Sequence, residues 1–340
     1  MNKRETARPL LRAAVIGLGV GERHAAAYYS DSRCELVALC DFDEVKLAEV
    51  GSRYHATKLT TVSDEILCDP NVDVVSIASY DNHHASQVIS ALKAGKHVFV
   101  EKPLCLYSEE LTNVTAALEK APHLKLSSNF VLRKVERFKE LKNKITAGKL
   151  GQIYYLEGDY DYGRIEKITD GWRGLTPGYS VFHGGGIHLV DLILWLSGRQ
   201  VCEVFAYGTQ IGTSGSVFKE NDMVCALLKL DGGIIAKVTA NFPSVTPHFH
   251  KLCVYGTQGS FIQSHGGASY QWSREKNSNG DVCRDAYPDT SSKKKEVITS
   301  FVSSIIDGGS CDVLPTEVLE VMRVSLAIEK SIVLGKPVRL

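Results

Sequence analysis

The stretch His97–Pro103, HVFVEKP, decides the fold of the N-terminal part of the chain. Its centre, Val98-Phe99-Val100, is β-branched and aromatic, and it stops at a Glu-Lys-Pro turn. Such a short apolar run predicts a strand that is buried on both faces of a parallel sheet. Ligands of open α/β sheets bind beyond the carboxyl ends of the strands, where Lys102 stands and could donate to a substrate hydroxyl or carbonyl group. The alternative is a solvated lysine in an ordinary strand-to-helix loop.

A glycine-rich turn far upstream predicts a dinucleotide site. Gly17, Gly19 and Gly21 lie between an apolar strand and an alanine-rich helix, and such amides can bind a pyrophosphate. The third glycine comes one residue too early for a strict G-x-G-x-x-G. Asp41 ends the next predicted strand, 20 residues after Gly21, where its carboxylate can accept both ribose hydroxyls and repel a 2′-phosphate. The pattern predicts NAD, with NADP disfavoured; the alternative for Asp41 is a helix cap.

Strands and helices alternate along the first part of the chain. Six apolar strands are predicted, the last of them at Leu124–Ser128, and amphipathic helices connect them. This alternation is typical of a doubly wound parallel sheet. We therefore predict an α/β protein whose N-terminal domain, residues 8–129, has a Rossmann fold.

The pattern changes after residue 129. Alternating strands follow one another with few helices, and Asp-Gly-Gly joins Met223–Leu230 to Ile234–Phe242 as a hairpin. We expect residues 130–340 to form an α+β domain with an open, mostly antiparallel sheet that binds substrate. Only one face of that sheet can be covered by its own helices, which predicts a homodimer or a homotetramer. The polar segment His265–Glu296 is expected to be a surface loop.

The segment Ser180–Gly198 combines three consecutive glycines with a helix. The glycines permit close approach of the backbone to another group, and His188 and Asp191 then share one helix face at i and i+3. The two side chains can point together into a cleft, and His183 lies just before the glycines as a further substrate-binding candidate. The alternative for His188 and Asp191 is a satisfied surface pair.

Residues 158–178 are dense in aromatic and basic side chains. Trp172 could stack on a sugar or base, and Arg164 and Arg173 could bind a diphosphate. This combination favours a nucleotide-linked sugar over a free sugar or cyclitol as substrate. The alternative is an exposed loop whose charged residues are solvated.

Composition excludes several classes of protein. The 340 residues contain 39 basic and 39 acidic side chains, so no overall basic field attracts nucleic acid or anionic lipid. Nine cysteines without a C-x-x-C pair indicate free thiols in a reducing compartment and disfavour zinc and disulfides. The N-terminus lacks an apolar leader and no run is long enough to span a bilayer. We expect a cytoplasmic protein that binds no metal.

Together, these residues resemble the glucose-fructose oxidoreductase/inositol dehydrogenase family, also called Gfo/Idh/MocA. The resemblance covers essentially the whole chain. Its most specific part is the glycine turn joined to AGKHV and EKP. The matching motifs are Gly17-Leu18-Gly19 with His24, His84 with Ala94-Gly95-Lys96-His97, Glu101-Lys102-Pro103, Gly-Gly-Gly-x-His-x-x-Asp, Gly148-Lys149-Leu150-Gly151 and Gly335-Lys336-Pro337-Val338.

This resemblance implies an NAD(H)- or NADP(H)-dependent enzyme that oxidises or reduces sugars or cyclitols. Lys102 matches the family's EKP lysine, His188 its acid/base histidine, and Asp191 the aspartate that follows. Many sugar and inositol dehydrogenases of the family carry a further aspartate where this chain has Gly184, so their proton relay does not carry over. The residues expected at the cofactor are His84, Glu101, Lys102 and Pro103, besides the glycines and Asp41.

The sequence therefore favours an oxidoreductase that moves a hydride between nicotinamide and a secondary alcohol or ketone, most of all of a nucleotide sugar. His188 would take the hydroxyl proton and Lys102 would stabilise the negative charge that develops on the oxygen. One alternative is an inositol or free-sugar dehydrogenase. Another is a non-catalytic NAD-binding regulator of the same family, which the presence of both Lys102 and His188 disfavours.

Overall fold

The computed structural model describes residues 10–275, 280–283, 287 and 290–340. The described chain forms two compact units. The first unit contains the residues up to Leu104, Thr112–Asn129 and Lys294–Pro315; the second contains Cys105–Leu111, Phe130–Lys293 and Thr316–Leu340. Each unit therefore combines segments that lie far apart in the sequence, which differs from the predicted division into residues 8–129 and 130–340.

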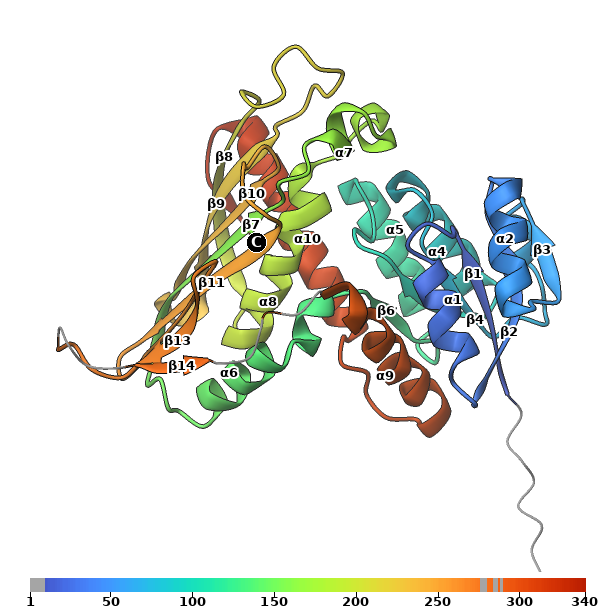
Figure 1. The fold of residues 1–340 in the computed structure, drawn as a ribbon, viewed down its shortest axis with the longest axis horizontal. Helices are drawn as coiled ribbons and strands as arrows, with labels where there is room; N and C mark the ends of the chain where they lie inside the picture. Colours follow the sequence, from blue (N-terminus) through green and yellow to red (C-terminus); the bar gives the residue numbers. More distant parts are fainter. Residues whose placement is uncertain (1–9, 276–279, 284–286, 288–289) are drawn as a thin grey trace, which may run out of the picture. The chain divides into compact units, whose positions relative to one another are not determined.

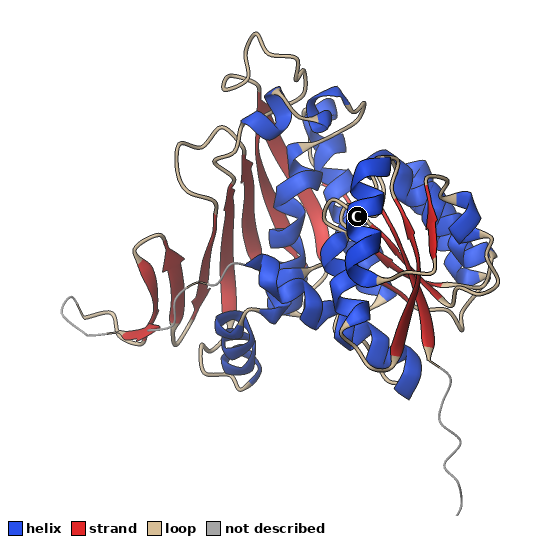
Figure 2. Ribbon diagram, turned by 45° about the vertical axis from the view of Figure 1, so that its right-hand side comes forward, coloured by secondary structure: helices blue, strands red, loops and turns tan. Residues whose placement is uncertain are grey.

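A six-stranded parallel sheet organises the first unit. The strand order is β3-β2-β1-β4-β5-β6, and helices cover both faces (Figures 1 and 2). The predicted doubly wound fold is thereby confirmed. The strands are β1 (Leu11–Ile16), β2 (Cys34–Cys40), β3 (Lys58–Thr60), β4 (Val74–Ile77), β5 (His97–Val100) and β6 (Leu126–Ser128). The connecting helices are α1 (Glu22–Tyr29), α2 (Glu44–Tyr54), α3 (Asp64–Leu67), η1 (Asp81–His83), α4 (His84–Lys93) and α5 (Ser108–Glu119).

Helix α9 (Lys294–Asp307) completes the core of the first unit. It packs beside α1, and the Phe301 ring lies 5.6 Å from the Phe99 ring of β5, between centroids. The buried face of α9 consists of Val297, Ile298, Phe301 and Val302. The predicted boundary placed this helix in the second domain; the structure assigns it to the first because its apolar face is buried there.

A nine-stranded sheet organises the second unit, in the order β14-β13-β12-β11-β7-β10-β9-β8-β15. All neighbours are antiparallel except β7 and β10, which confirms the mostly antiparallel prediction. Its strands are β7 (Ile153–Asp161), β8 (Val201–Thr209), β9 (Met223–Leu230), β10 (Ile235–Asn241), β11 (Phe249–Gly256), β12 (Ser260–Ser264), β13 (Gly267–Gln271), β14 (Asp281–Cys283) and β15 (Val338–Arg339). Its helices are η2 (Val131–Lys134), α6 (Glu136–Thr146), α7 (Glu166–Thr169), η3 (Trp172–Leu175), η4 (Phe182–Gly186), α8 (Ile187–Ser197), η5 (Asp231–Gly233), η6 (Thr290–Lys293) and α10 (Pro315–Leu334).

Helices α8 and α10 cover one face of this sheet (Figure 1). Leu189 of α8 lies close to the Gly158 backbone of β7, and Ser331 of α10 accepts a hydrogen bond from the Ala206 amide of β8. Within the described ranges, no helix combines the length and the apolar character needed to cross a membrane.

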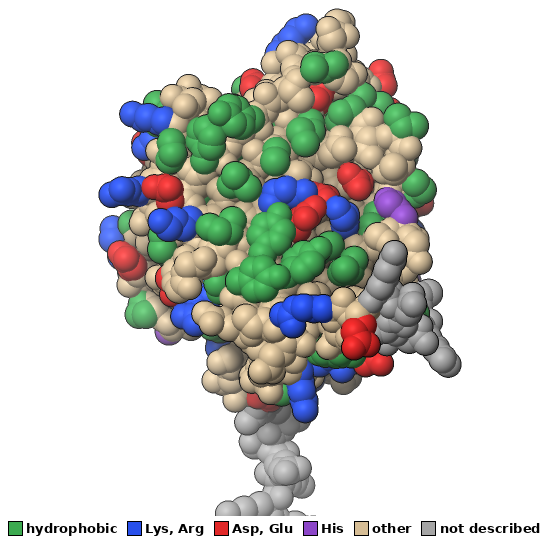
Figure 3. All heavy atoms as spheres, turned by 90° about the vertical axis from the view of Figure 1, so that its left-hand side faces the viewer, with side chains coloured by type: hydrophobic (Ala, Val, Ile, Leu, Met, Phe, Trp, Pro, Cys, Tyr) green, Lys and Arg blue, Asp and Glu red, His purple; other side chains and the backbone are tan. Residues whose placement is uncertain are grey.

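The other face of the sheet is open, and Figure 3 looks onto it. Apolar side chains such as Leu227, Ile235 and Tyr207 are exposed there. A group of charged side chains lies at the centre of the face. In this group, Lys237 and Lys251 each contact both Glu157 and Asp159 at distances of 2.6 to 3.1 Å.

Part of the segment expected to be a loop, His265–Glu296, is ordered. Strands β13 and β14 extend the sheet, and α9 begins at Lys294. The expectation of a loop was wrong for these parts because Ala268 and Tyr270 alternate with polar residues and are buried. Residues 276–279, 284–286 and 288–289 of the segment lie outside the described residues.

Candidate active site

The glycine turn after β1 leaves room for a phosphate group. A Cβ atom at Gly17 would stand 2.3 Å from the Ala78 carbonyl oxygen, and one at Gly21 would stand 1.9 Å from the Gly17 oxygen. At Gly19 a Cβ would meet no described atom within 4 Å. Two glycines therefore make the turn compact, and the third faces open space. Helix α1 begins here without a described side-chain cap, so its first amides fit a pyrophosphate.

Asp41 is buried directly beside this turn. One carboxylate oxygen accepts the Leu18 amide at 2.6 Å, and the other accepts the Asp43 amide at 3.0 Å. The predicted ribose acceptor thus also holds the glycine turn in place. An ionised carboxylate has about four acceptor positions, so acceptor capacity remains for ribose hydroxyls.

A buried carboxylate, Glu101, follows strand β5. Its Oε1 atom accepts hydrogen bonds from Lys294 Nζ at 2.7 Å, Asn129 Nδ2 at 2.8 Å and His24 Nε2 at 3.2 Å. Burial alone would raise the pKa of Glu101, but the Lys294 ammonium and the His24 hydrogen bond hold this pKa well below its usual range. Burial lowers the pKa of His24, so its imidazole is neutral and donates from Nε2. Glu101 therefore fixes the EKP turn from inside the first unit.

His84 fixes the same turn from the other side. Its Nδ1 lies 2.6 Å from the Pro103 carbonyl oxygen and its Nε2 lies 3.1 Å from the Ser79 carbonyl oxygen. Lys102 is half-buried, and its peptide bond to Pro103 is cis. Four of the residues expected at the cofactor, His84, Glu101, Lys102 and Pro103, thus meet around the carboxyl ends of β4 and β5, where Glu101 and His84 hold the backbone that carries Lys102.

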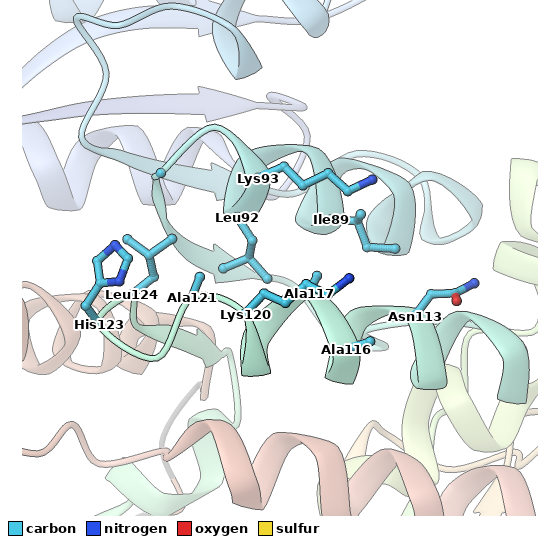
Figure 4. A pocket seen from close by; sticks show the side chains of 11 residues that line it. Ile89, Leu92, Lys93, Asn113, Ala116, Ala117, Lys120, Ala121, His123 and Leu124 are labelled. Carbon is cyan, nitrogen blue, oxygen red and sulfur yellow. The ribbon is translucent and has the colours of Figure 1, made fainter.

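A pocket of about 590 Å³ lies elsewhere in the first unit, between α4 and α5 (Figure 4). Apolar residues including Leu92 and Leu124 line it, together with Lys93 and Lys120. Gly95 and His123 precede β5 and β6, so the pocket is at the amino ends of these strands. It is therefore at the opposite edge of the sheet from Lys102 and the glycine turn.

In the second unit, two tyrosine side chains lie directly against the glycines before α8. A Cβ atom at Gly184 would stand 2.1 Å from the Tyr179 hydroxyl oxygen, and one at Gly185 would stand 2.3 Å from the Tyr160 ring. Any larger residue would displace these side chains. The three glycines form a π-helical turn, η4, so the predicted close approach to the backbone is made by tyrosines of the same unit.

His188, in the first turn of α8, lies among a tyrosine ring and two other histidine rings. Its imidazole stacks on Tyr160 with centroids 6.3 Å apart, and it meets His250 edge-on at 6.2 Å. His248 lies 4.8 Å from His250, between ring centroids. Burial raises the pKa of Tyr160, which therefore stays protonated. Arg164 and Arg173 act electrostatically on Tyr160, so two cations belong to the wider surroundings of this ring cluster.

Asp191 does not share these surroundings. It is fully buried, and both of its oxygens accept hydrogen bonds from Arg133, the shortest at 2.6 Å. Burial raises the pKa of Asp191 to about 6, an effect that the Arg133 guanidinium opposes. Arg133 also contacts Glu317 of α10 at 2.8 Å. The geometry thus places Asp191 in an ion pair that joins η2, α8 and α10, and the i, i+3 spacing does not bring it to the partners of His188.

The expected substrate residues are divided between two environments. The Arg164 guanidinium lies 5.4 Å from the Tyr162 ring centre, and that of Arg173 lies 4.5 Å from the Trp172 ring centre. These four residues form two local cation–π pairs between β7 and η4. His183 is buried within η4 itself.

Two family models match the chain. Residues 11–130 match the oxidoreductase family with an NAD-binding Rossmann fold, and residues 138–262 match the GFO/IDH/MocA C-terminal domain. The chain belongs to the Gfo/Idh/MocA family. It is an NAD-dependent oxidoreductase, which confirms the predicted cofactor and enzyme class and disfavours the regulator alternative.

Named relatives of this Gfo/Idh/MocA oxidoreductase act on inositols. It is 30% identical to myo-inositol 2-dehydrogenase of Thermotoga maritima, over 73% of this chain and 74% of the relative. It is 28% identical to scyllo-inositol 2-dehydrogenase (NAD(+)) of Bacillus subtilis, over 74% and 73%. The fold matches scyllo-inositol dehydrogenase from Lactobacillus casei, solved with NAD(H) and scyllo-inositol, with a TM-score of 0.80, 20% identity, and 97% and 99% coverage.

Sequence reasoning missed several residues around His188 and Glu101. His248 and His250 belong to the segment PHFHK, in which a spacing of two puts both on one face of a strand, and this signal was readable. Arg133 and Lys294 are 58 and 193 residues from the carboxylates that they bind, and no local pattern identifies such partners.

We predict that Lys294→Met destabilises the protein by about 3–5 kcal/mol near neutral pH, because it leaves the Glu101 carboxylate buried without a cation. The lowered pKa of Glu101 means that its ionised form stabilises the wild type above the unfolded value of about 4.3. This contribution disappears as the pH falls through the folded value. In the variant, burial without the Lys294 cation raises the pKa of Glu101, so its carboxyl takes up a proton at a higher pH than in the wild type. The loss in the variant should therefore shrink already in mild acid.

Urea unfolding at pH 7 and pH 4.5 measures this difference. The control is Lys295→Met, which removes the neighbouring exposed lysine and should change the free energy of unfolding by less than about 0.5 kcal/mol. Equal losses for Lys294→Met and Lys295→Met would contradict the buried ion pair.

We predict that Arg133→Met also costs about 3–5 kcal/mol, because Asp191 then loses the donor of both its oxygens and must stay buried as an unpaired charge or take up a proton. Arg133→Met combined with Asp191→Leu should recover most of this loss, since both charges are removed. Arg323→Met is the control, because it breaks a half-exposed ion pair with Glu320 on α10 and should cost at most about 1 kcal/mol. Thermal and urea unfolding measure all three; no recovery in the double variant would argue against the pairing.

Proposed function

We propose that this oxidoreductase oxidises a secondary hydroxyl group of an inositol or a related cyclitol. The observation that carries the proposal is the similarity to inositol dehydrogenases over about three quarters of the chain, together with the cluster of aromatic and histidine rings around His188. NAD, when bound, accepts the hydride from the carbinol carbon. The glycine turn and Asp41 would hold it through its pyrophosphate and ribose.

The protein's own residues then have two chemical tasks. His188 would take the hydroxyl proton as a general base, because imidazole is the side chain most often used for this task, and this one is buried against the Tyr160 ring. Lys102 would stabilise the negative charge that develops on the same oxygen. Glu101 and His84, which hold the backbone around Lys102, would keep its ammonium group oriented.

The residues near His188 suit a neutral polyol better than a nucleotide sugar. Tyr160, His248 and His250 offer a phenol and two imidazoles that can exchange hydrogen bonds with a hydroxyl-rich ring. Arg164 and Arg173, expected to bind a diphosphate, are instead stacked on aromatic neighbours. Such stacking accounts for both arginines without an anionic ligand. The comparisons therefore favour the cyclitol alternative over the nucleotide sugar that the sequence suggested.

We also propose that the open face of the nine-stranded sheet binds a second copy of the chain. In a two-fold contact a face meets itself, so a surface of one charge would repel its copy. The central group of two lysines and two carboxylates is neutral overall, and exposed apolar residues such as Leu227 and Ile235 surround it. A face of this composition is suited to self-association.

The cysteines support a reducing compartment, which we propose to be the cytoplasm. All nine are free thiols. Burial raises the pKa of Cys40 to about 11 and that of Cys34 to about 12, which keeps both protonated and unreactive.

We predict NADH formation with myo- or scyllo-inositol and little with UDP-glucose, followed by absorbance. Lys102→Met and His188→Asn should each lower kcat/KM about a hundredfold or more, while folding and NAD binding stay nearly intact. Lys330→Met, at an exposed position of α10, serves as the control. Turnover of UDP-glucose without turnover of any inositol would refute the substrate class, and full activity of His188→Asn would refute the base.

The proposed interface predicts a dimer or a tetramer at micromolar concentration by light scattering. Leu227→Glu should reduce the assembly to monomers, because it would bury a charge at the contact. Val333→Glu introduces the same charge at an exposed position of α10 and should leave assembly intact. A monomeric wild type would show that the open face serves another purpose.

A further inference from the structure

Two exposed aromatic side chains lie in contact at the carboxyl edge of the parallel sheet. Phe42 and Tyr80 come two and three residues after the ends of β2 and β4. Their ring centroids are 5.5 Å apart, and the ring planes are tilted by 59°. Phe42 is 70% exposed and Tyr80 is 36% exposed, so the pair contributes little to the core. Single exposed apolar residues are common, whereas apolar groups that gather on a surface often mark a binding site.

The pair spans the end of the strand that carries the glycine turn. Strand β1 lies between β2 and β4 in the sheet. The Gly17 amide donates to the Cys40 carbonyl oxygen at 2.8 Å, and the Ala78 amide donates to the Ile16 carbonyl oxygen at 2.7 Å. These hydrogen bonds bring the ends of the three strands to one level, and each aromatic residue stands two residues beyond them. Because the two rings are in contact, they meet beyond the carboxyl end of β1, where the glycine turn begins.

The backbone holds both aromatic residues in place although their side chains are exposed. Asp41 accepts the Asp43 amide at 3.0 Å, and the Asp43 carboxylate caps the first turn of α2. Phe42 is thus fixed between two anchored residues. The Tyr80 carbonyl oxygen accepts the His83 amide at 2.9 Å within η1. Rings on such a fixed backbone can receive a ligand at a small cost in conformational entropy.

We propose that Phe42 and Tyr80 bind the adenine ring of NAD by stacking. The inference rests on the proposed roles of the glycine turn and Asp41 in holding the pyrophosphate and the ribose. The base is joined to that ribose, so it lies beside the residues that surround Asp41, and Phe42 is the next residue in the chain. Adenine is flat, uncharged and aromatic, and it binds aromatic side chains through its face.

The chemistry of the pair also suits NAD better than NADP. Phe42 and Tyr80 bring ring surface to the adenosine end of the cofactor, and neither brings a cation. A 2′-phosphate is typically accommodated by an arginine near this position. The carboxylate of Asp41 precedes Phe42 directly and would repel such a phosphate. The aromatic pair thus completes a site for an adenosine whose ribose is not phosphorylated.

The first test measures binding of ADP-ribose by isothermal titration calorimetry. This probe carries the adenine, the ribose and the pyrophosphate of NAD but no nicotinamide. We expect Phe42→Ala and Tyr80→Ala each to raise its Kd roughly fivefold to a hundredfold, the range found for loss of one stacking ring. Phe42→Tyr keeps the ring and should bind like the wild type. An unchanged Kd in Phe42→Ala would overturn the proposal.

Tyr29→Ala is the matched control. Tyr29 is 53% exposed, and its ring meets Tyr54 edge-on at 5.6 Å between centroids, so it belongs to an aromatic pair of the same kind. It is the last residue of α1, whereas the glycine turn lies before the first. This variant should bind ADP-ribose like the wild type. Equal losses in Tyr29→Ala and Phe42→Ala would show that the effect is not local to the base and would overturn the assignment.

The second test observes the base directly. The H2 and H8 NMR signals of adenine move upfield when an aromatic ring covers the face of the base. We expect this shift when ADP-ribose binds to the wild type and to Tyr29→Ala, and a smaller shift with Phe42→Ala. Equal shifts with the wild type and Phe42→Ala would contradict stacking on this ring.

Neither test requires turnover, which separates this inference from the proposed function. A wild type that oxidises no inositol would refute the proposed substrate, and the two binding tests would still decide the adenine site. Asp41→Asn, measured with the same probe, examines the ribose. If it weakens binding of ADP-ribose while Phe42→Ala does not, the ribose site stands and the aromatic site falls. If neither variant weakens binding, the cofactor lies elsewhere and the aromatic site falls with the ribose site.

Discussion

The structure of the first unit depends on the burial of one carboxylate. Glu101 accepts hydrogen bonds from α1, from the residue after β6 and from α9, through His24, Asn129 and Lys294. A carboxylate without these partners would not stay ionised in such a position. Three segments that are distant in sequence therefore set the position of the turn that carries Lys102.

In the second unit, polar aromatic rings pack around the start of helix α8. Gly184 and Gly185 let Tyr179 and Tyr160 approach the backbone, and His188 then stacks on Tyr160. Burial raises the pKa of Tyr160, so this phenol stays protonated, although Arg164 and Arg173 act on it electrostatically. The buried Arg133 is paired separately, with Asp191.

The sequence predicts the parallel sheet well because its strands are short apolar runs bounded by glycine, proline and polar residues. It does not predict α9, because the lysines before it suggest a loop although the apolar spacing of Val297 and Phe301 is helical. The same limit applies to the residues of the candidate site. Glycines and histidines can be found from spacing, whereas the partners of Glu101 and Asp191 come from other parts of the chain and require the folded structure.

The discontinuous first unit has a consequence for synthesis of the chain. Its six strands are complete when residue 129 has been made, but the helix that covers them ends near residue 307. At about 5–20 residues per second, the ribosome needs on the order of ten to forty seconds for the intervening segment. During this interval the growing chain exposes the apolar surface that Phe301 later covers. Lys294, the cation that pairs with Glu101, has not yet been added to the chain. The nascent protein is thus open to chaperones and to aggregation at its cofactor-binding half until nearly the whole polypeptide has emerged.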